Sequence, residues 1–174
     1  MARLRKGVSY TKVERPYTRK SKYKKKSYVK SVPVCKVTKF DMGELGRKFE
    51  YKVLLKPKKA VQLRHDTLES GRMTANFTMQ KVLGPKGYYF KVRVYPHHAL
   101  RENPIAAGAG ADRMSTGMTL SFGKVIGIAA QVKKDQPVFE IDVDKQNLDL
   151  AKNALRKAKT KFPCSCLIEV MKNN

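Results

Sequence analysis

Several features that would place this chain in a common protein class are scarce or missing. It has no tryptophan, only three cysteines, and 14 acidic residues against 38 lysines and arginines. No run of about 18 apolar residues is present, so nothing predicts a membrane-spanning helix. The N-terminus lacks the apolar segment of a secretory signal, and the odd number of cysteines does not indicate a disulfide framework. We therefore expect a reduced, cytoplasmic protein that does not bind membranes.

The shortage of acidic residues leaves a formal net charge of +24 over 174 residues. Such a charge repels itself in an isolated domain, so it indicates a polyanionic partner. Binding to an anionic membrane would call for an amphipathic basic helix with Trp or Phe on its apolar side, and the sequence offers none. Nucleic acid is therefore the favoured partner.

Motifs for catalysis and metal binding are also missing. Gly108-Ala-Gly-Ala-Asp112 lacks the Gly-Lys-Ser/Thr ending of a phosphate-binding loop and does not lead from a strand into a periodic helix. Cys164 and Cys166 would share one side of a strand, where His97 and His98 could complete a zinc site. The usual zinc spacing is C-x₂₋₄-C, however, and a strand can simply bury two cysteines. We expect no enzymatic activity, no cofactor and no metal.

The most basic part of the chain is its beginning. Residues 1–32 hold twelve lysines and arginines, one acid (Glu14) and four tyrosines, with no run of aliphatic residues. This composition cannot form a core by itself. Lys and Arg displace counterions from phosphates and tyrosine rings stack on unpaired bases, so the segment suits RNA. We predict an extended RNA-binding tail, the alternative being a solvated tail or localisation signal.

Folded sequence begins near Val34, and residues 33–174 are predicted to form a single domain. Alternation with a period of two predicts strands over 35–40 and 49–55, with residues 41–43 and Gly46 as turns between them. Asp66-Thr-Leu-Glu69 resembles a capping box and predicts a helix over 66–82.

The buried stripe of that helix would contain small residues that let it lie close to a sheet. Its members are Leu68, Gly71, Ala75, Met79 and Val82.

The second half of the chain predicts more strands and one more helix. Strands are expected over 88–95 and 164–170, and residues 124–132 and 137–143 are predicted to pair as a hairpin. Asp144 would cap a helix that ends near Lys159, with a buried stripe of Leu and Ala side chains. Strands dominate, with two helices for one face. The predicted class is α+β with a mostly antiparallel sheet.

A loop of small residues, 103–118, interrupts this pattern. It has neither helical nor strand periodicity and is nearly free of charge in a basic chain. Gly and Ala bring too little apolar surface to form a core, but they let a backbone approach a partner closely. A loop this long in a small domain is usually functional or disordered, and a flexible linker is the alternative.

Seven stretches of the chain resemble one family in order, from about residue 3 to 170. They are Arg15-Pro-Tyr-Thr-Arg-Lys-Ser21, Phe40-Asp-Met-Gly43, Leu63-Arg-His-Asp-Thr-Leu-Glu-Ser-Gly-Arg-Met-Thr-Ala-Asn76, Arg93-Val-Tyr-Pro-His-His98, Arg101-Glu-Asn103, Ala107-Gly-Ala-Gly-Ala-Asp-Arg113 and Phe122-Gly-Lys124. The family is universal large-subunit ribosomal protein sixteen, in its archaeal branch, protein ten-e. The family commonly has an Arg soon after Thr-Gly-Met and a Pro after Phe-Gly-Lys, where this chain has Thr119-Leu120 and Val125. The short C-terminus favours an archaeal source.

The resemblance implies an α/β-hammerhead-like fold docked on large-subunit rRNA, near the path by which aminoacyl-tRNA enters. It implies that the Gly/Ala-rich loop points toward the peptidyl-transferase centre and the tRNA acceptor arm. The expected partners are rRNA, tRNA and neighbouring ribosomal proteins. A free RNA chaperone or regulator is the alternative with the same chemistry, and an RNA-modifying enzyme would need a catalytic site that the sequence does not offer.

The candidate site residues fall into three groups. Candidate rRNA contacts in the tail are Arg3, Arg5, Lys6, Arg15, Tyr17, Arg19, Lys20, Lys22, Lys24, Lys25 and Lys26. Those in the domain are Arg64, His65, Arg72, Arg93, Arg101 and Lys124, of which the first three cluster near a helix N-terminus that favours phosphate. The tRNA-proximal loop residues are Gly108, Gly110, Asp112, Arg113 and Ser115.

Overall fold

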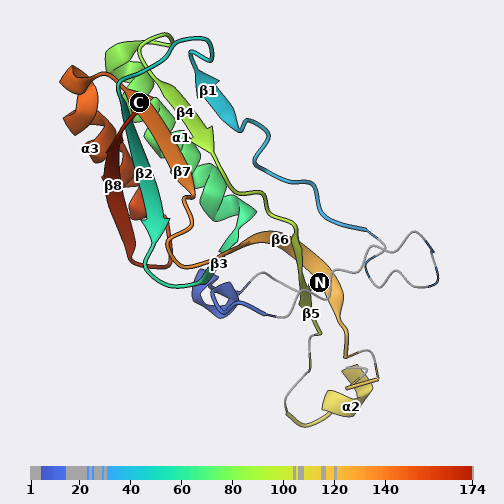
Figure 1. Ribbon diagram of the computed structural model, residues 1–174. Helices are drawn as coiled ribbons and strands as arrows, with labels where there is room; N and C mark the ends of the chain where they lie inside the picture. The colour runs from blue at the N-terminus through green and yellow to red at the C-terminus, as the bar shows by residue number, and fades with distance from the viewer. Residues whose placement is uncertain are drawn as a thin grey trace.

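Two helices cover one face of a five-stranded sheet, and a second, three-stranded sheet projects away from this body (Figure 1). The computed structural model describes residues 5–14, 23, 25, 29, 31–103, 105, 108–114, 117–119 and 121–173. All strand pairs in the two sheets are antiparallel. The predicted α+β class with a mostly antiparallel sheet is thereby confirmed.

The large sheet has the strand order β1-β4-β7-β2-β8. These strands are β1 (Asp41–Gly43), β4 (Tyr89–Val92), β7 (Phe139–Val143), β2 (Tyr51–Pro57) and β8 (Cys166–Lys172). The strands predicted over 49–55, 88–95, 137–143 and 164–170 are confirmed, with their ends moved by three residues at most. Alternation along β2 sends Val53 and Leu55 toward the helices, where both are fully buried.

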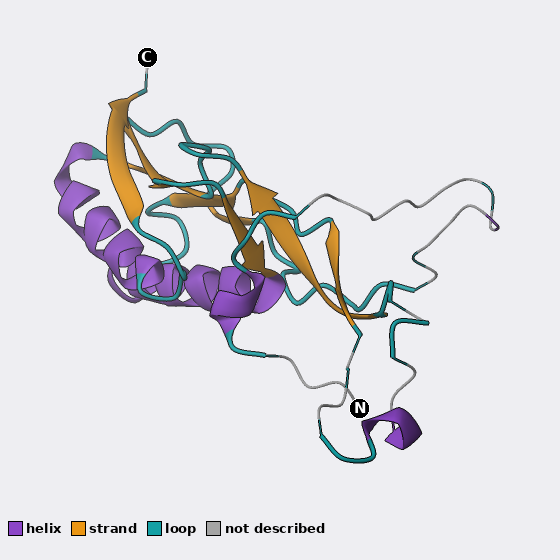
Figure 2. Ribbon diagram, turned by 90° about the horizontal axis from the view of Figure 1, so that it is seen from below, coloured by secondary structure: helices purple, strands orange, loops and turns teal. Residues whose placement is uncertain are grey.

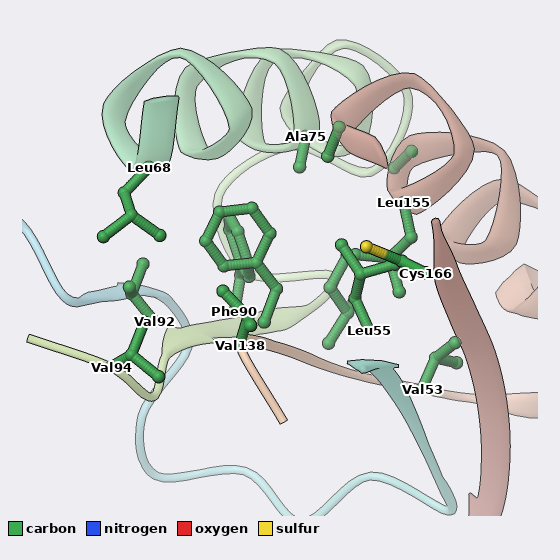
Figure 3. Packing of buried hydrophobic residues seen from close by; sticks show 14 of the residues in the cluster. Val53, Leu55, Leu68, Ala75, Phe90, Val92, Val94, Val138, Leu155 and Cys166 are labelled. Atoms are coloured by element: carbon green, nitrogen blue, oxygen red, sulfur yellow. The ribbon is translucent and has the colours of Figure 1, made fainter. Parts of the chain in front are cut away.

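The core lies between this sheet and the helices α1 (His65–Leu83) and α3 (Leu148–Lys159) (Figures 2 and 3). Gly71 explains how closely α1 approaches the sheet. A Cβ placed on Gly71 would lie 2.9 Å from Cε2 of Phe139. The predicted close approach through small residues is confirmed, and so is the buried stripe except for Val82, which is 64% exposed near the end of the helix.

The small sheet has the order β3-β6-β5, with β3 (Val61–Arg64), β6 (Lys124–Val132) and β5 (His98–Glu102). The predicted hairpin of 124–132 with 137–143 is therefore wrong, because β6 and β7 belong to different sheets. The residues after β6 form hydrogen bonds with β2 instead. Asp135 N donates to Pro57 O at 3.0 Å, and Val138 N donates to Leu55 O at 2.8 Å. The strands β3 and β5 were not predicted.

The segment before β1 also differs from the prediction. Residues 35–40 form no strand, and the residues expected as a turn, 41–43, form β1. Val37 is buried, so the alternation of apolar side chains does mark burial there. The Lys36 amide donates to Nδ1 of His65 at 3.2 Å, so a side chain takes the place of a strand partner.

Both predicted helix caps are replaced by ion pairs. The N-cap position of α1 is Arg64, with no side-chain capping bond, and Asp66 instead pairs with Lys36 at 2.7 Å. Asp144 precedes a 3-10 turn, η3 (Lys145–Asn147), that leads into α3, and its carboxylate pairs with Arg47.

The start of the chain contacts the small sheet. Residues 5–14 include a 3-10 turn, η1 (Gly7–Tyr10), and run beside β3. Gln62 N donates to Thr11 O and its Nε2 donates to Tyr10 O, both at 3.0 Å, while Nε2 of Gln131 donates to Glu14 O at 2.7 Å. Polar hydrogen bonds to a neighbouring sheet thus hold this segment in place, and its inability to form a core by itself stays a prediction.

Candidate nucleic-acid interface

The strands β5 and β6 form an arm that carries the Gly/Ala-rich loop at its tip (Figure 1). We call residues 98–132 the arm. Arg101, Glu102, Gly123 and Lys124 lie where the two strands end and the loop begins, and we call them the arm root. Glu102 pairs with Lys124 in the strand register, and Arg101 pairs with Val125 after a bulge. The guanidinium of Arg101 lies 4.2 Å from the ring centre of Phe122, a cation–π contact that holds it at the root.

The N-terminal segment brings more positive charge to the root. Arg5 Nε contacts Glu102 Oε1 at 2.6 Å, so the acid of the root is neutralised. Lys6 and Lys124 are exposed and have no acidic partner among the residues that the structure describes. The predicted contacts Arg5, Lys6, Arg101 and Lys124 are thus brought to one end of the small sheet.

Half-buried Arg64 and buried His98 lie in one row across the small sheet. Arg64 of β3 and His98 of β5 both lie opposite Ala129 of β6, and Arg64 also lies 5.6 Å from the ring centre of Tyr10. His98 is 3% exposed, and neither of its ring nitrogens has a hydrogen-bond partner among the described residues. Burial lowers the pKa of His98, Glu14 opposes this, and Arg101 adds to it. His98 is therefore neutral at neutral pH.

Two predicted contacts have internal roles. His65 is buried, it accepts the Lys36 amide, and burial lowers its pKa. Arg72 is also buried; its Nη2 contacts Glu69 at 2.5 Å and its Nη1 lies 3.1 Å from the sulfur of Met42. The hydrogen bond to Glu69 raises the pKa of Arg72, since it favours the charged form. The structure does not bring these two side chains to the surface.

Arg93 lies apart from the arm, in the chain that leads from β4 to β5. Its side chain is 44% exposed and forms an ion pair with Glu140 of β7. The pKa of Glu140 is lowered despite its burial, because Lys52 and Arg93 both bind the carboxylate. The charge of Arg93 is therefore partly neutralised by Glu140, while the exposed part of its side chain faces solvent.

The loop at the tip is open. Gly108 and Gly110 have φ values of 127° and 83°, and a Cβ on either would meet no atom within 4 Å. A single helical turn, α2 (Ala111–Met114), follows; it contains Asp112 and leaves Arg113 exposed. Sequence periodicity did not predict this turn. Asn103 Nδ2 donates to Gly117 O at 3.0 Å and so links the two sides of the loop.

Several predicted contacts lie outside the described residues, and one described tail residue, Lys25, is exposed. Those outside are Arg3, Arg15, Tyr17, Arg19, Lys20, Lys22, Lys24, Lys26 and Ser115.

Within the described part of the chain, no group of three or more His, Cys, Asp and Glu side chains could hold a metal ion. Cys164 and Cys166 do lie together, with 3.6 Å between their sulfurs. No described helix is long and apolar enough to cross a membrane.

A basic arm root in a chain of net charge +24 is what a protein with a polyanionic partner needs. Comparison with known proteins shows the family. The chain matches the family described as ribosomal protein L16p/L10e over residues 16–169.

Curated relatives cover nearly the whole chain, and each is described as large ribosomal subunit protein uL16. The one from Methanococcus maripaludis strain C7 is 46% identical over 155 residues, covering 89% of this chain and 90% of the relative. The one from M. maripaludis strain S2 is 44% identical over 169 residues, covering 97% and 95%. The one from Methanococcus aeolicus is 43% identical over 169 residues, covering 97% and 95%.

The chain belongs to the ribosomal protein L16p/L10e family. This confirms the resemblance drawn from the seven motifs and its archaeal character. It also confirms that the protein is a cytoplasmic ribosomal protein and not an enzyme.

Proposed function

We propose that this protein is a constituent of the large ribosomal subunit that binds rRNA and helps to position tRNA near the peptidyl-transferase centre. The relatives are large-subunit proteins by description. In this proposal the tail (1–32) and the arm root contact rRNA phosphates, and the domain formed by 33–174 holds the arm in place. Neighbouring ribosomal proteins are further partners.

One observation carries the proposal: the arm separates a charged root from a tip that is nearly free of charge. Arg101 and Lys124 of the root, with Arg5 and Lys6 of the N-terminal segment, lie around Glu102, which Arg5 neutralises. Phosphate contacts fix a protein on RNA without reading its sequence, which suits this end of the arm. The tip holds an open Gly/Ala backbone with Arg113 as its exposed basic residue. A tip of this kind approaches a second RNA by its backbone.

Removing the tip tests whether the root binds rRNA while the tip contacts tRNA. Replacing 105–113 by a short Gly-Ser link should leave the fold and rRNA binding intact, because loop length changes closure entropy by only about 0.6 kcal/mol per doubling. Large subunits that contain the variant should bind tRNA poorly and form peptide bonds slowly. Normal rates on fully loaded subunits would refute a role for the tip.

A free RNA chaperone or regulator would use the same positive charge. Cosedimentation separates the two functions, because a subunit constituent stays with large subunits in moderate salt. Release of the protein at that salt would favour the free binder.

A further inference from the structure

Four lysines lie on two turns at the opposite end of β6 from the arm root, and the proposed function does not use them. Lys58 and Lys59 follow β2, and Lys133 and Lys134 follow β6. All four are exposed. We call them the turn-lysine cluster.

Main-chain hydrogen bonds hold the two turns together. Asp135 N donates to Pro57 O at 3.0 Å, which joins the second turn to the first. Lys58 N donates to Ser165 O at 3.0 Å, which ties the first turn to the start of β8. Lys133 N donates to Oε1 of Gln136 at 2.9 Å within the second turn. The lysine side chains therefore start from a fixed backbone.

The charge of this cluster is left almost unneutralised. In the residues described by the structure, its single acidic partner is Asp135, 3.9 Å from Lys134. Three lysines of the large sheet, in contrast, pair with acids. Lys52 contacts Glu140 at 2.6 Å, Lys91 contacts Asp41 at 3.5 Å, and Lys56 pairs with Glu169.

The contrast indicates a surface that meets negative charge from outside. With 14 acids for 38 basic residues, the chain cannot neutralise every lysine. Glu140 and Glu169 neutralise Lys52 and Lys56 of β2, whereas Asp135 is the one acid that pairs with the turn lysines among the residues that the structure describes. Four positive charges on a fixed backbone repel one another unless an anion lies against them.

We infer that the turn-lysine cluster is a second RNA contact that binds backbone phosphates, separate from the arm root. β6 has nine residues, so at about 3.3 Å per residue it keeps the cluster roughly 30 Å from Lys124. The two contacts are too far apart to bind the same few phosphates. The protein therefore joins two RNA segments, and the cluster reads no bases, because lysine meets phosphate as a point charge. This inference rests on the proposed function in that it takes RNA as the partner.

The test compares two variants of the full chain with equal net charge. The first is Lys58→Gln, Lys59→Gln, Lys133→Gln and Lys134→Gln. The control carries Lys81→Gln, Lys86→Gln, Lys145→Gln and Lys157→Gln, which are exposed lysines away from the turns. Binding to in-vitro transcribed large-subunit rRNA is measured over an about sixfold range of salt concentration, from about 50 to about 300 mM. Melting curves by circular dichroism establish that both variants fold.

Each lost phosphate contact lowers the slope of log affinity against log salt by about 0.7–0.9. The cluster variant should therefore lose about 3 from the slope, and the control less than about 1. Equal slopes for two folded variants would overturn the inference, since net charge alone would then explain binding. If the cluster variant kept the wild-type slope but no longer bound a neighbouring acidic protein, the cluster would be a protein contact, and the inference would also be overturned.

Failure of this inference is distinguishable from failure of the proposed function. Wild-type protein that does not bind the rRNA refutes the proposed function. Wild-type protein that binds, with no difference between the two variants, refutes only the turn-lysine cluster as a separate contact.

Discussion

Gly123 at the root of the arm offers a sharp test of how the arm is built. It has a φ of +74°, and a Cβ there would lie 2.6 Å from the carbonyl carbon of Glu102 and 2.9 Å from the amide nitrogen of Asn103. A left-handed residue other than Gly costs about 1–2 kcal/mol, and forcing a methyl group against packed atoms costs about 1–3 kcal/mol. Because these atoms belong to the main chain, no side chain can move aside.

We expect Gly123→Ala to open the pairing of β5 with β6 at the root, at a cost of about 2–5 kcal/mol. Amide hydrogen exchange of Arg101, Glu102 and Lys124 should then be faster by about 30-fold or more, since 1.4 kcal/mol is a factor of ten. The helical signal in circular dichroism, which comes mainly from α1 and α3, should be unchanged, because the core of the body does not include the root.

Gly110→Ala is the matched control. Gly110 also has a positive φ, +83°, but a Cβ there meets nothing within 4 Å. Its cost is the backbone term alone, about 1–2 kcal/mol, and that strain stays in the open tip. Equal exchange rates at the root in the two variants would refute the close approach of Gly123 to Glu102.

Four further outcomes follow from the same structure. Asp142→Asn should stabilise the protein by about 2 kcal/mol at pH 7 in urea unfolding, because burial raises the pKa of Asp142 to about 6 and the ionised form is disfavoured in the folded state; no gain would contradict this. The pKa of His98 is lowered by burial, so the unfolded state binds protons first and stability should fall as pH drops below about 6.5, less so in His98→Gln; identical pH profiles of wild type and variant would be the contrary result. Deleting residues 1–32 should flatten the salt dependence of rRNA binding by about 0.7–0.9 per lost phosphate contact, whereas an unchanged slope would mean that the tail only solvates. Arg113→Ala should weaken tRNA binding by large subunits less than removal of 105–113 does, and an equal or greater loss would contradict a backbone contact.

The sequence by itself determined the elements whose signal is local. A helix buries one stripe with a period of 3.6, so Leu68, Ala75 and Met79 identified α1 without any knowledge of its partner. The same reasoning located α3. Spaced motifs such as Leu63–Asn76 identified the family, and the shortage of acids predicted a polyanionic partner. Each of these inferences depends on residue order and composition alone.

Only the tertiary structure decided which segments meet. Strand pairing is non-local, so the sequence could not show that β7 lies between β4 and β2 while β6 joins β3 and β5. Nor could it show which basic side chains are available. Arg72 and His65 resemble surface contacts in sequence but are buried, whereas Lys133 and Lys134, which resemble an ordinary turn, are exposed beside Lys58. The physical reason is that a charge is neutralised by whatever lies within a few ångströms in space, and 75 residues of chain separate Lys58 from Lys133.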